Sequence, residues 1–561
     1  MGRDRAALIN FGLINSGLIN SGLISWRLIT WRSGRFVQAA IPVLFLTALV
    51  AWPLVAVMRR SLGDAGFSDV VEVLGRSSVQ SVLVFTIWQA ALSALFTVLV
   101  GLPIAHIVAR YRFRGRSALR AFVIVPFVLP TVVVAAAFDS VFDRFGVGLD
   151  RTLWAVLAAH VFFNVAVVVR VVGGFWSRMD RRQLEVAATL GASPARAWFT
   201  ITLRQLLPVL TGSALLVFLF SFTSFGVIRV LGGLRRATVE TEIYRYAIAR
   251  QEFDVAAVLA GLQILVVLVL AVASARFQRR HATVHRSAPN PVPVNSLARR
   301  LHLSSVVALA VAVLGVPVAV LVEQSFRLGA TAEAAYGLRN YRALFERVDL
   351  LPVSAVGALA NSLWFAAVAA VIATLVGGCA ALAIERGGLS GRILEAVALL
   401  PLGVSAVTLG FGYLLGFTVF DLRRSVWLVP VAHAVVGLPF VLAALLPSLR
   451  SINPRTREAA AILGAGPATV RRTVDWPLTK RAVGTGCGFA AAVSVGEFGA
   501  TSFLGRGAGS FTAPLAIFRL LSSPGDQLRG QALALSVVIG LVVVVLAAAI
   551  EYRRDEGVSL L

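Results

Sequence analysis

Charged residues are scarce in this sequence: they make up 14% of its 561 positions, whereas hydrophobic residues make up 58%. A water-soluble chain of this length would need far more polar residues to cover its surface. Apolar runs such as residues 82–108 and 533–550 are long enough to cross a bilayer as helices. A transmembrane barrel would instead show alternating segments of about ten residues. The sequence therefore predicts an all-α membrane protein.

Lysine is nearly absent, since Lys480 is the only one and Arg481 follows it. A P-loop that binds nucleotide phosphates ends in lysine followed by serine or threonine. This chain has no such motif, and its six histidines show no metal-ligand spacing. We therefore expect no catalytic residue, no metal site and no cofactor within the chain, which is not predicted to be an enzyme.

The formal net charge is +25. The arginines cluster in short loops between apolar spans, for example in residues 110–116 and 178–182. This is the positive-inside pattern of membrane proteins, and it is not the basic face of a soluble domain that binds nucleic acid. We expect a multi-pass protein of the cell (inner, cytoplasmic) membrane, with the lipid bilayer around it and both termini in the cytoplasm.

About twelve spans are expected, in two sets of six. They lie near residues 37–58, 82–109, 119–141, 153–174, 209–230 and 255–276, and near 304–324, 362–384, 394–417, 426–448, 482–504 and 531–551. The corresponding domains are 37–276 and 304–551, joined by a polar, proline-containing cytoplasmic linker at 277–303. The repeated pentads of residues 1–36 are expected to form a disordered tail, and residues 552–561 form a second tail.

The two sets of spans repeat one another. Trp88 matches Trp364, which lies 276 positions on (364 − 88), and His160 matches His433, which lies 273 positions on (433 − 160). Because six is an even number, both halves enter the membrane in the same sense. The sequence thus predicts two parallel six-helix repeats.

Each half has one long loop after its fourth span. The loops read EVAATLGASPARAWFTITLRQLLP from Glu185 and EAAAILGAGPATVRRTVDWP from Glu458. Gly191 and Gly464, each six residues after the acid, are able to take a positive φ and so end a short helix. A proline three residues after each glycine can then begin a second helix. We predict a helix–turn–helix elbow outside the membrane in each half.

These loops resemble the EAA loop of binding-protein-dependent ABC importer permeases, in which EAA is followed by three residues, Gly, nine residues and I-x-L-P. The first copy departs from the pattern at Val186 and Arg204, and the second at Val474 and Trp476. The resemblance covers residues 37–551. It implies coupling of the loops to a separate ATP-binding subunit, in two copies, that holds ATP and Mg, and an extracytoplasmic solute-binding protein as a further partner. The implied coupling residues are Glu185, Ala187, Gly191, Glu458, Ala459, Ala460 and Gly464.

One acid stands inside a predicted span. Glu497 lies in SVGEFGATSFLG, and an ionisable residue within a membrane is a functional candidate because its burial is costly. The candidate translocation path comprises Phe225, Gly226, Glu497, Phe498 and Gly499. The alternative is that Glu497 pairs internally with an arginine or lies at a span end. His160 and His433 are expected to form hydrogen bonds between helices.

Three resemblances bear on the cargo. Residues 237–263 resemble fused thiamine permeases, and fused ferric-iron permeases share the overall layout, whereas GEFGATSFLG resembles molybdate and sulfate permeases. We expect an importer of a small solute, with thiamine or ferric iron favoured and an oxyanion as the alternative. A twelve-helix ion-coupled secondary transporter is a further alternative, although buried acids are scarce.

Overall fold

The computed structural model describes residues 38–552 except 65, 150, 234–235, 281–290, 330–334, 419–424 and 506. The predicted N-terminal tail, and the C-terminal tail beyond Tyr552, lie outside these residues. The described chain is mainly helical. Two short strand pairs occur: β1 (Tyr111–Arg112) pairs in parallel with β2 (Val292–Pro293), and β3 (Arg327–Leu328) pairs antiparallel with β4 (Ala335–Tyr336).

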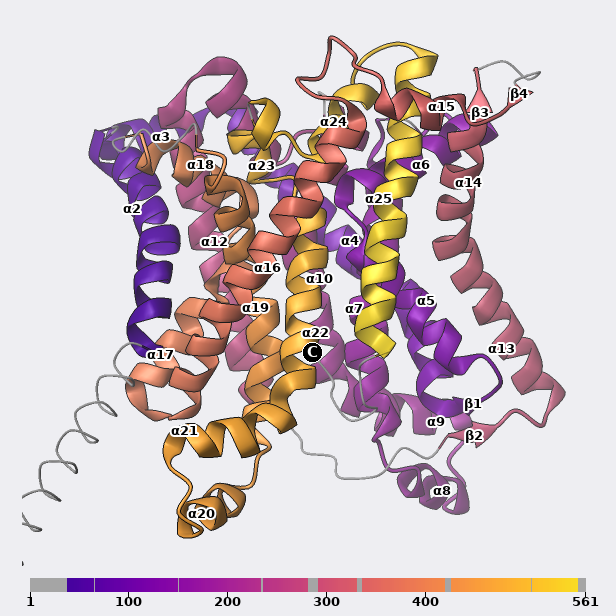
Figure 1. Ribbon diagram of the computed structural model, residues 1–561. Coiled ribbons are helices and arrows are strands. Elements are labelled where there is room, and N and C mark those ends of the chain that lie inside the picture. The colour runs from indigo at the N-terminus through magenta and orange to yellow at the C-terminus, as the bar shows by residue number, and fades with distance from the viewer. Residues whose placement is uncertain are drawn as a thin grey trace, which may run out of the picture.

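The helices form two successive sets (Figure 1). The first set comprises α2 (Trp52–Arg59), α3 (Gly66–Gly75), α4 (Ser77–Arg110), α5 (Arg116–Val128), α6 (Thr131–Phe145), α7 (Leu153–Ser177), α8 (Arg182–Thr189), α9 (Pro194–Ala197), α10 (Leu203–Phe222), α11 (Val239–Tyr244) and α12 (Phe253–Arg280). The second comprises α13 (Leu297–Ala310), α14 (Val316–Phe326), α15 (Arg339–Arg342), α16 (Ala355–Glu385), α17 (Gly388–Leu399), α18 (Ala406–Gly416), α19 (Leu428–Arg450), α20 (Pro454–Ile462), α21 (Pro467–Val470), α22 (Trp476–Val495), α23 (Thr501–Leu504), α24 (Ala513–Leu521) and α25 (Asp526–Tyr552).

The second set repeats the first. Adding 273 to the bounds of α10 gives those of α22 (203 + 273 = 476, 222 + 273 = 495), and the same offset relates α9 to α21. Packing repeats as well. A Cβ added to Gly101 of α4 would lie 2.8 Å from Cβ of Val168 in α7, and one added to Gly377 of α16 would lie 2.9 Å from Cγ1 of Val441 in α19. These glycines allow the two central helices of each half to approach closely.

Nine helices within the described residues are long and apolar enough to cross a membrane, or ten if α5 and α6, bent by 103°, form one span. The expected count of twelve is therefore not confirmed. The third expected span is this bent pair, the ninth is broken between α17 and α18, and α22 ends at Val495, inside the eleventh. The break between α5 and α6 follows from Pro130, because the residue before a proline avoids helical geometry; Leu129 has a ψ of 141°.

The two halves are packed into one another. α2 of the first half packs on α18 of the second, and α14 of the second packs on α6 of the first. At the first contact, the indole N–H of Trp52 donates to the carbonyl of Gly416 at 3.1 Å. Near the second, Arg529 of α25 lies 2.9 Å from a carboxylate oxygen of Asp139 and 3.4 Å from one of Asp143, both in α6. The first spanning helix of each half thus packs against helices of the other half.

Candidate functional site: a cavity between the halves and two elbows

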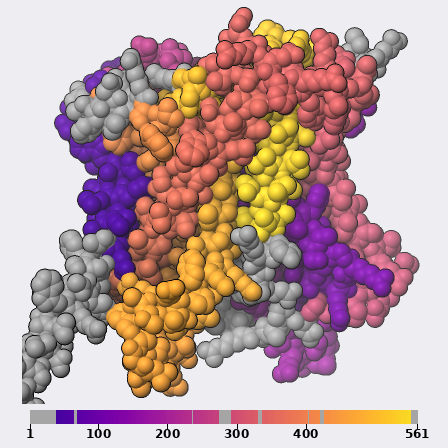
Figure 2. All heavy atoms as spheres, viewed as in Figure 1, coloured from indigo at the N-terminus to yellow at the C-terminus, as the bar shows by residue number. Residues whose placement is uncertain are grey.

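Both predicted elbows are present, and they protrude at the same end of the molecule (Figures 1 and 2). The first consists of α8 and α9 and contains Glu185 and Ala187; the second consists of α20 and α21 and contains Glu458, Ala459 and Ala460. A glycine with positive φ lies two residues after the end of the first helix of each elbow, with φ of +79° at Gly191 and +86° at Gly464. This confirms the predicted turn geometry.

The spacing of the EAA pattern has a local physical reason. The N–H of Gly191 donates to the carbonyl of Ala188, and that of Ala192 donates to the carbonyl of Ala187. In the second elbow the same two bonds run from Gly464 to Ala461 and from Ala465 to Ala460. Together they form a Schellman motif, which closes a helix and needs a left-handed residue, usually glycine. The motif residues therefore build the turn itself.

The tips of the elbows expose large apolar side chains. Leu190 is 81% exposed, and its counterpart Leu463 (190 + 273) is 87% exposed. Neither α8 nor α20 contains a buried residue. An exposed apolar surface on a short rigid helix is typical of a surface that binds another protein.

Only the second elbow is held by ion pairs among the described residues. Arg457 of α20 lies 2.6 Å from a carboxylate oxygen of Glu385, at the end of α16, and 2.7 Å from one of Asp475. Burial lowers the pKa of Arg457, but the hydrogen bonds and charges of these two acids outweigh it and raise the pKa. The first elbow has Leu184 at the equivalent position (457 − 273), and Gln183 bonds Gln205 there at 2.5 Å.

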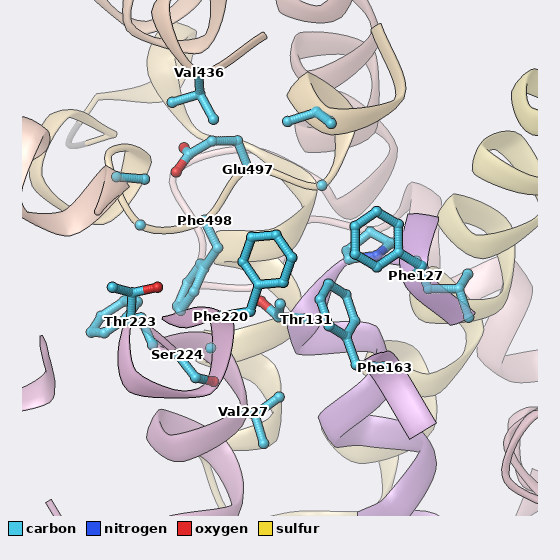
Figure 3. A pocket seen from close by; sticks show the side chains of 18 of the residues that line it. Phe127, Thr131, Phe163, Phe220, Thr223, Ser224, Val227, Val436, Glu497 and Phe498 are labelled. Carbon is cyan, nitrogen blue, oxygen red and sulfur yellow. The ribbon is translucent and has the colours of Figure 1, made fainter. Parts of the chain in front are cut away.

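A cavity of about 260 Å³ lies between the two halves. All five residues of the predicted translocation path line it, with Phe225 and Gly226 from the first half and Glu497, Phe498 and Gly499 from the second. Further phenylalanines complete the wall: Phe127, Phe163, Phe220, Phe440 and Phe489. The described lining residues include no lysine or arginine. Figure 3 shows several of these rings turned toward one another around the space.

The two halves meet in the cavity at equivalent residues. The rings of Phe225 and Phe498 (225 + 273) are stacked, with centroids 5.2 Å apart and planes at 26°. Gly226 and Gly499 follow them, and each allows a close approach. A Cβ added to Gly226 would collide with Oγ1 of Thr131, and one added to Gly499 would lie 3.1 Å from Cβ of Ala406. The glycines thus allow the turn after α10 and the turn after α22 to lie against α6 and α18.

Glu497 is internally bonded. One carboxylate oxygen accepts from the N–H of Ala500 at 2.8 Å, and the other accepts from the hydroxyl of Thr501 at 2.7 Å and lies 3.1 Å from Nε2 of His433. The carboxylate caps α23 and is turned away from the rings of Phe220 and Phe163 (Figure 3). Glu497 thus lies just past the end of α22 at Val495, in agreement with the span-end alternative, and the expected arginine partner is not found among the described residues, where His433 takes its place.

The histidines form hydrogen bonds between helices, as expected. His160 bonds the hydroxyls of Ser93 and Ser224, both at 2.9 Å, and His433 bonds those of Ser494 and Thr501, both at 2.8 Å. Within the described residues no group of three or more His, Cys, Asp or Glu side chains could hold a metal ion.

Two features of this region were not predicted from the sequence. Asn164 lines the cavity and is 1% exposed, and its side-chain oxygen has no hydrogen-bond partner in the described part of the chain. Next to the stacked pair, the guanidinium of Arg229 lies 5.2 Å from the ring centres of Tyr244 and Phe518. A lone asparagine in an apolar span is a signal that could have found the first. The contact of Arg229 with Phe518 joins segments far apart in the sequence, so no local signal could have predicted it.

Comparison with known proteins places the chain among transport proteins. Residues 98–282 match the family "Binding-protein-dependent transport system inner membrane component". The thiamine transport system permease protein ThiP of Brucella abortus is 26% identical over 90% of this chain and 92% of that protein, and ThiP of Escherichia coli is 28% identical over 83% and 88%. The molybdenum transport system permease protein ModB of Mycobacterium bovis is 30% identical over 41% of this chain and 90% of that protein.

These likenesses extend over both halves, and they agree with the repeated helices and with the paired elbows that follow α7 and α19. They set aside the ion-coupled secondary transporter. The chain belongs to the family of binding-protein-dependent transport system inner membrane components, and it is the membrane-spanning permease of an ABC importer.

Proposed function

We propose that this chain imports thiamine, which a solute-binding protein delivers from outside. The observation that carries the proposal is the cavity lining, with seven phenylalanines and no lysine or arginine among its described residues. Aromatic faces attract cations and stack on flat rings. Thiamine combines a cationic thiazolium ring with an aminopyrimidine. An oxyanion would instead be expected to need arginine, lysine or backbone N–H donors.

Two further observations support thiamine. The thiamine permeases ThiP of Brucella abortus and Escherichia coli align with 90% and 83% of this chain, whereas the molybdenum permease aligns with 41% of it. The free oxygen of Asn164 can accept a hydrogen bond from an amino group such as that of the pyrimidine. Ferric iron, the other favoured cargo, requires oxygen or nitrogen ligands. The carboxylate of Glu497 and the ring nitrogens of His160 already have partners.

The test is uptake into proteoliposomes that contain this chain, its ATP-binding subunit and its binding protein. We expect ATP-dependent uptake of labelled thiamine, and none of molybdate, sulfate or ferric iron. Asn164→Leu should raise the KM for thiamine about 2- to 10-fold, the value of one hydrogen bond. Asn164→Asp, which keeps an acceptor oxygen, is the matched variant. Uptake of an oxyanion in place of thiamine would refute the proposal.

As part of this proposal, the energy of ATP hydrolysis reaches this chain through the two elbows. Two copies of a separate ATP-binding subunit, which hold ATP and Mg, receive α8 and α20 in the cytoplasm, where both termini of this chain also lie. The exposed leucines at equivalent tips support this docking. The seven motif residues act by shaping the two turns. The proposal also keeps the predicted division into a first permease domain (37–276), a linker (277–303) and a second permease domain (304–551). α13 begins at Leu297, inside the linker range.

Docking is tested by co-purification. Leu190→Arg combined with Leu463→Arg should abolish recovery of the ATP-binding subunit with this chain, because each change places a charge in an apolar contact. Leu389→Arg is the control, since this leucine is 75% exposed on α17, outside the elbows. Full recovery of the ATP-binding subunit with the double variant would overturn the elbow assignment.

A further inference from the structure

A second hollow lies on the outside of the first half. It is an open groove of about 550 Å³ between α5 and α13. Its walls include Arg114, Leu119, Phe122, Arg300, Val307 and Val311. In Figure 2 the segments that carry these residues lie side by side at the lower right. Neither the transport site nor the elbows use this groove.

The groove has two chemically different parts. Leu119, Phe122, Val307 and the 51% exposed Val311 give it an apolar floor. At its rim stand two exposed arginines, and no side-chain partner is found for either within the part of the chain that the structure describes. These are Arg114 and Arg300.

The two segments that form the groove carry basic residues and no acidic ones. Residues 98–138 and 291–322 contain no aspartate or glutamate, although they carry several further arginines. Among these, Arg116 donates from Nε to the carbonyl of Val108 at 2.9 Å, and Arg120 donates to the same carbonyl at 3.4 Å. Within the described residues they bond only to neutral carbonyl oxygens, so no ion pair offsets their positive charge there. The potential over the rim therefore favours an anion.

The rim of the groove also lies close to the ends of candidate membrane spans, where lipid headgroups are expected. α4 ends at Arg110 and α13 begins at Leu297, so the rim arginines stand within a few residues of the ends of two candidate spans. These ends lie on the side of the molecule that carries the elbows (Figure 1). The apolar floor continues from there along α5 and α13. Basic pockets between spanning helices on the cytoplasmic side are suited to anionic lipid headgroups.

We propose that this groove binds an anionic phospholipid. The phosphate lies between the guanidinium groups of Arg114 and Arg300, and one acyl chain lies along Leu119, Phe122 and Val307. A zwitterionic lipid fills the floor but gains less at the rim, and a free phosphate ion gains nothing from the floor. Because α13 belongs to the second half and α5 to the first, the bound lipid links the two halves.

The test uses the purified full-length chain in mild detergent and native mass spectrometry. Phosphatidylglycerol, phosphatidylcholine with the same acyl chains, and inorganic phosphate are titrated separately. We expect tight retention of phosphatidylglycerol and weaker binding of the other two. Arg114→Gln with Arg300→Gln should weaken phosphatidylglycerol binding at least tenfold, since each arginine near an anionic headgroup contributes substantially to binding, and should leave phosphatidylcholine binding unchanged.

The control is Arg178→Gln with Arg392→Gln, which removes the same charge from exposed positions at the same end, outside the groove. It should retain phosphatidylglycerol like the unchanged chain. Equal loss in both double variants would mean a general charge effect and would overturn the proposal. So would equal retention of phosphatidylglycerol and phosphatidylcholine by the unchanged chain, or binding of inorganic phosphate as tight as that of the lipid.

Discussion

Arg457 ties α20 to the end of α16, and Arg457→Gln is expected to release the second elbow from the spanning helices. The guanidinium makes two charge-assisted hydrogen bonds, at 2.6 Å to Glu385 and 2.7 Å to Asp475. The three side chains are 14–25% exposed. Such bonds contribute about 1.5–3 kcal/mol each when buried, and well under that at the surface. For this partly exposed pair we take about 1 kcal/mol each, so about 2 kcal/mol is lost.

Hydrogen exchange of the α20 amides measures this loss directly. α20 has no buried residue, so Arg457 is a main anchor, and its removal should lower the free energy of local opening. A change of about 2 kcal/mol corresponds to roughly 30-fold faster exchange. Amides of α16 that precede Glu385 should exchange as before, because this long helix packs against α19 and α22.

The neighbouring Arg455→Gln is the matched control. Arg455 is exposed, its backbone N–H donates to the side chain of Asn453, and its guanidinium has no ion-pair partner among the described residues. It should leave exchange in α20 unchanged. If Arg457→Gln also left it unchanged, or if both variants accelerated it equally, the two ion pairs would not be what holds the elbow.

Three further predictions concern single positions. Gly464→Ala should destabilise its turn by about 1–2 kcal/mol because φ is +86°, seen as faster proteolysis of the elbow, whereas Gly466→Ala, at φ −67°, should not. Glu497→Gln should lower the free energy of unfolding by about 2–3 kcal/mol, measured as a lower Tm, because a neutral amide caps α23 less well. Gly226→Ala should abolish uptake, since its Cβ collides with Thr131; unchanged uptake would show that the turn can shift.

Local features could be predicted from the sequence. The turns at Gly191 and Gly464 depend on bonds between residues at most five apart, so the motif alone was enough to predict them. The break at Pro130 is similarly local, because proline restricts the residue before it. The repeat could be read from matched residues at constant offsets, and it brought Phe225 and Phe498 into one candidate path before any contact was known.

Contacts between distant segments could not be predicted in the same way. The partner of Glu497 is decided by where α19 passes the turn after α22, and the sequence gives no measure of that approach. The expected count of twelve spans is not confirmed for a related reason. A hydropathy window adds up apolar residues across a break, so α17 and α18 read as one span although a 3-10 turn at Leu400–Leu402 separates them.

The two halves share the same backbone arrangement but differ in the positions of their charged side chains. Arg457 has Leu184 as its counterpart, and Glu497 has Ser224 (497 − 273). Arg457 adds ion pairs where the second elbow meets α16, and Glu497 adds a hydrogen-bonded contact with His433 beside the cavity. Ion pairs of this kind hold side chains in one arrangement, whereas the first elbow relies on a neutral bond between Gln183 and Gln205. We therefore expect α8 to exchange its amides faster than α20, and the second half to transmit movement of its elbow more rigidly.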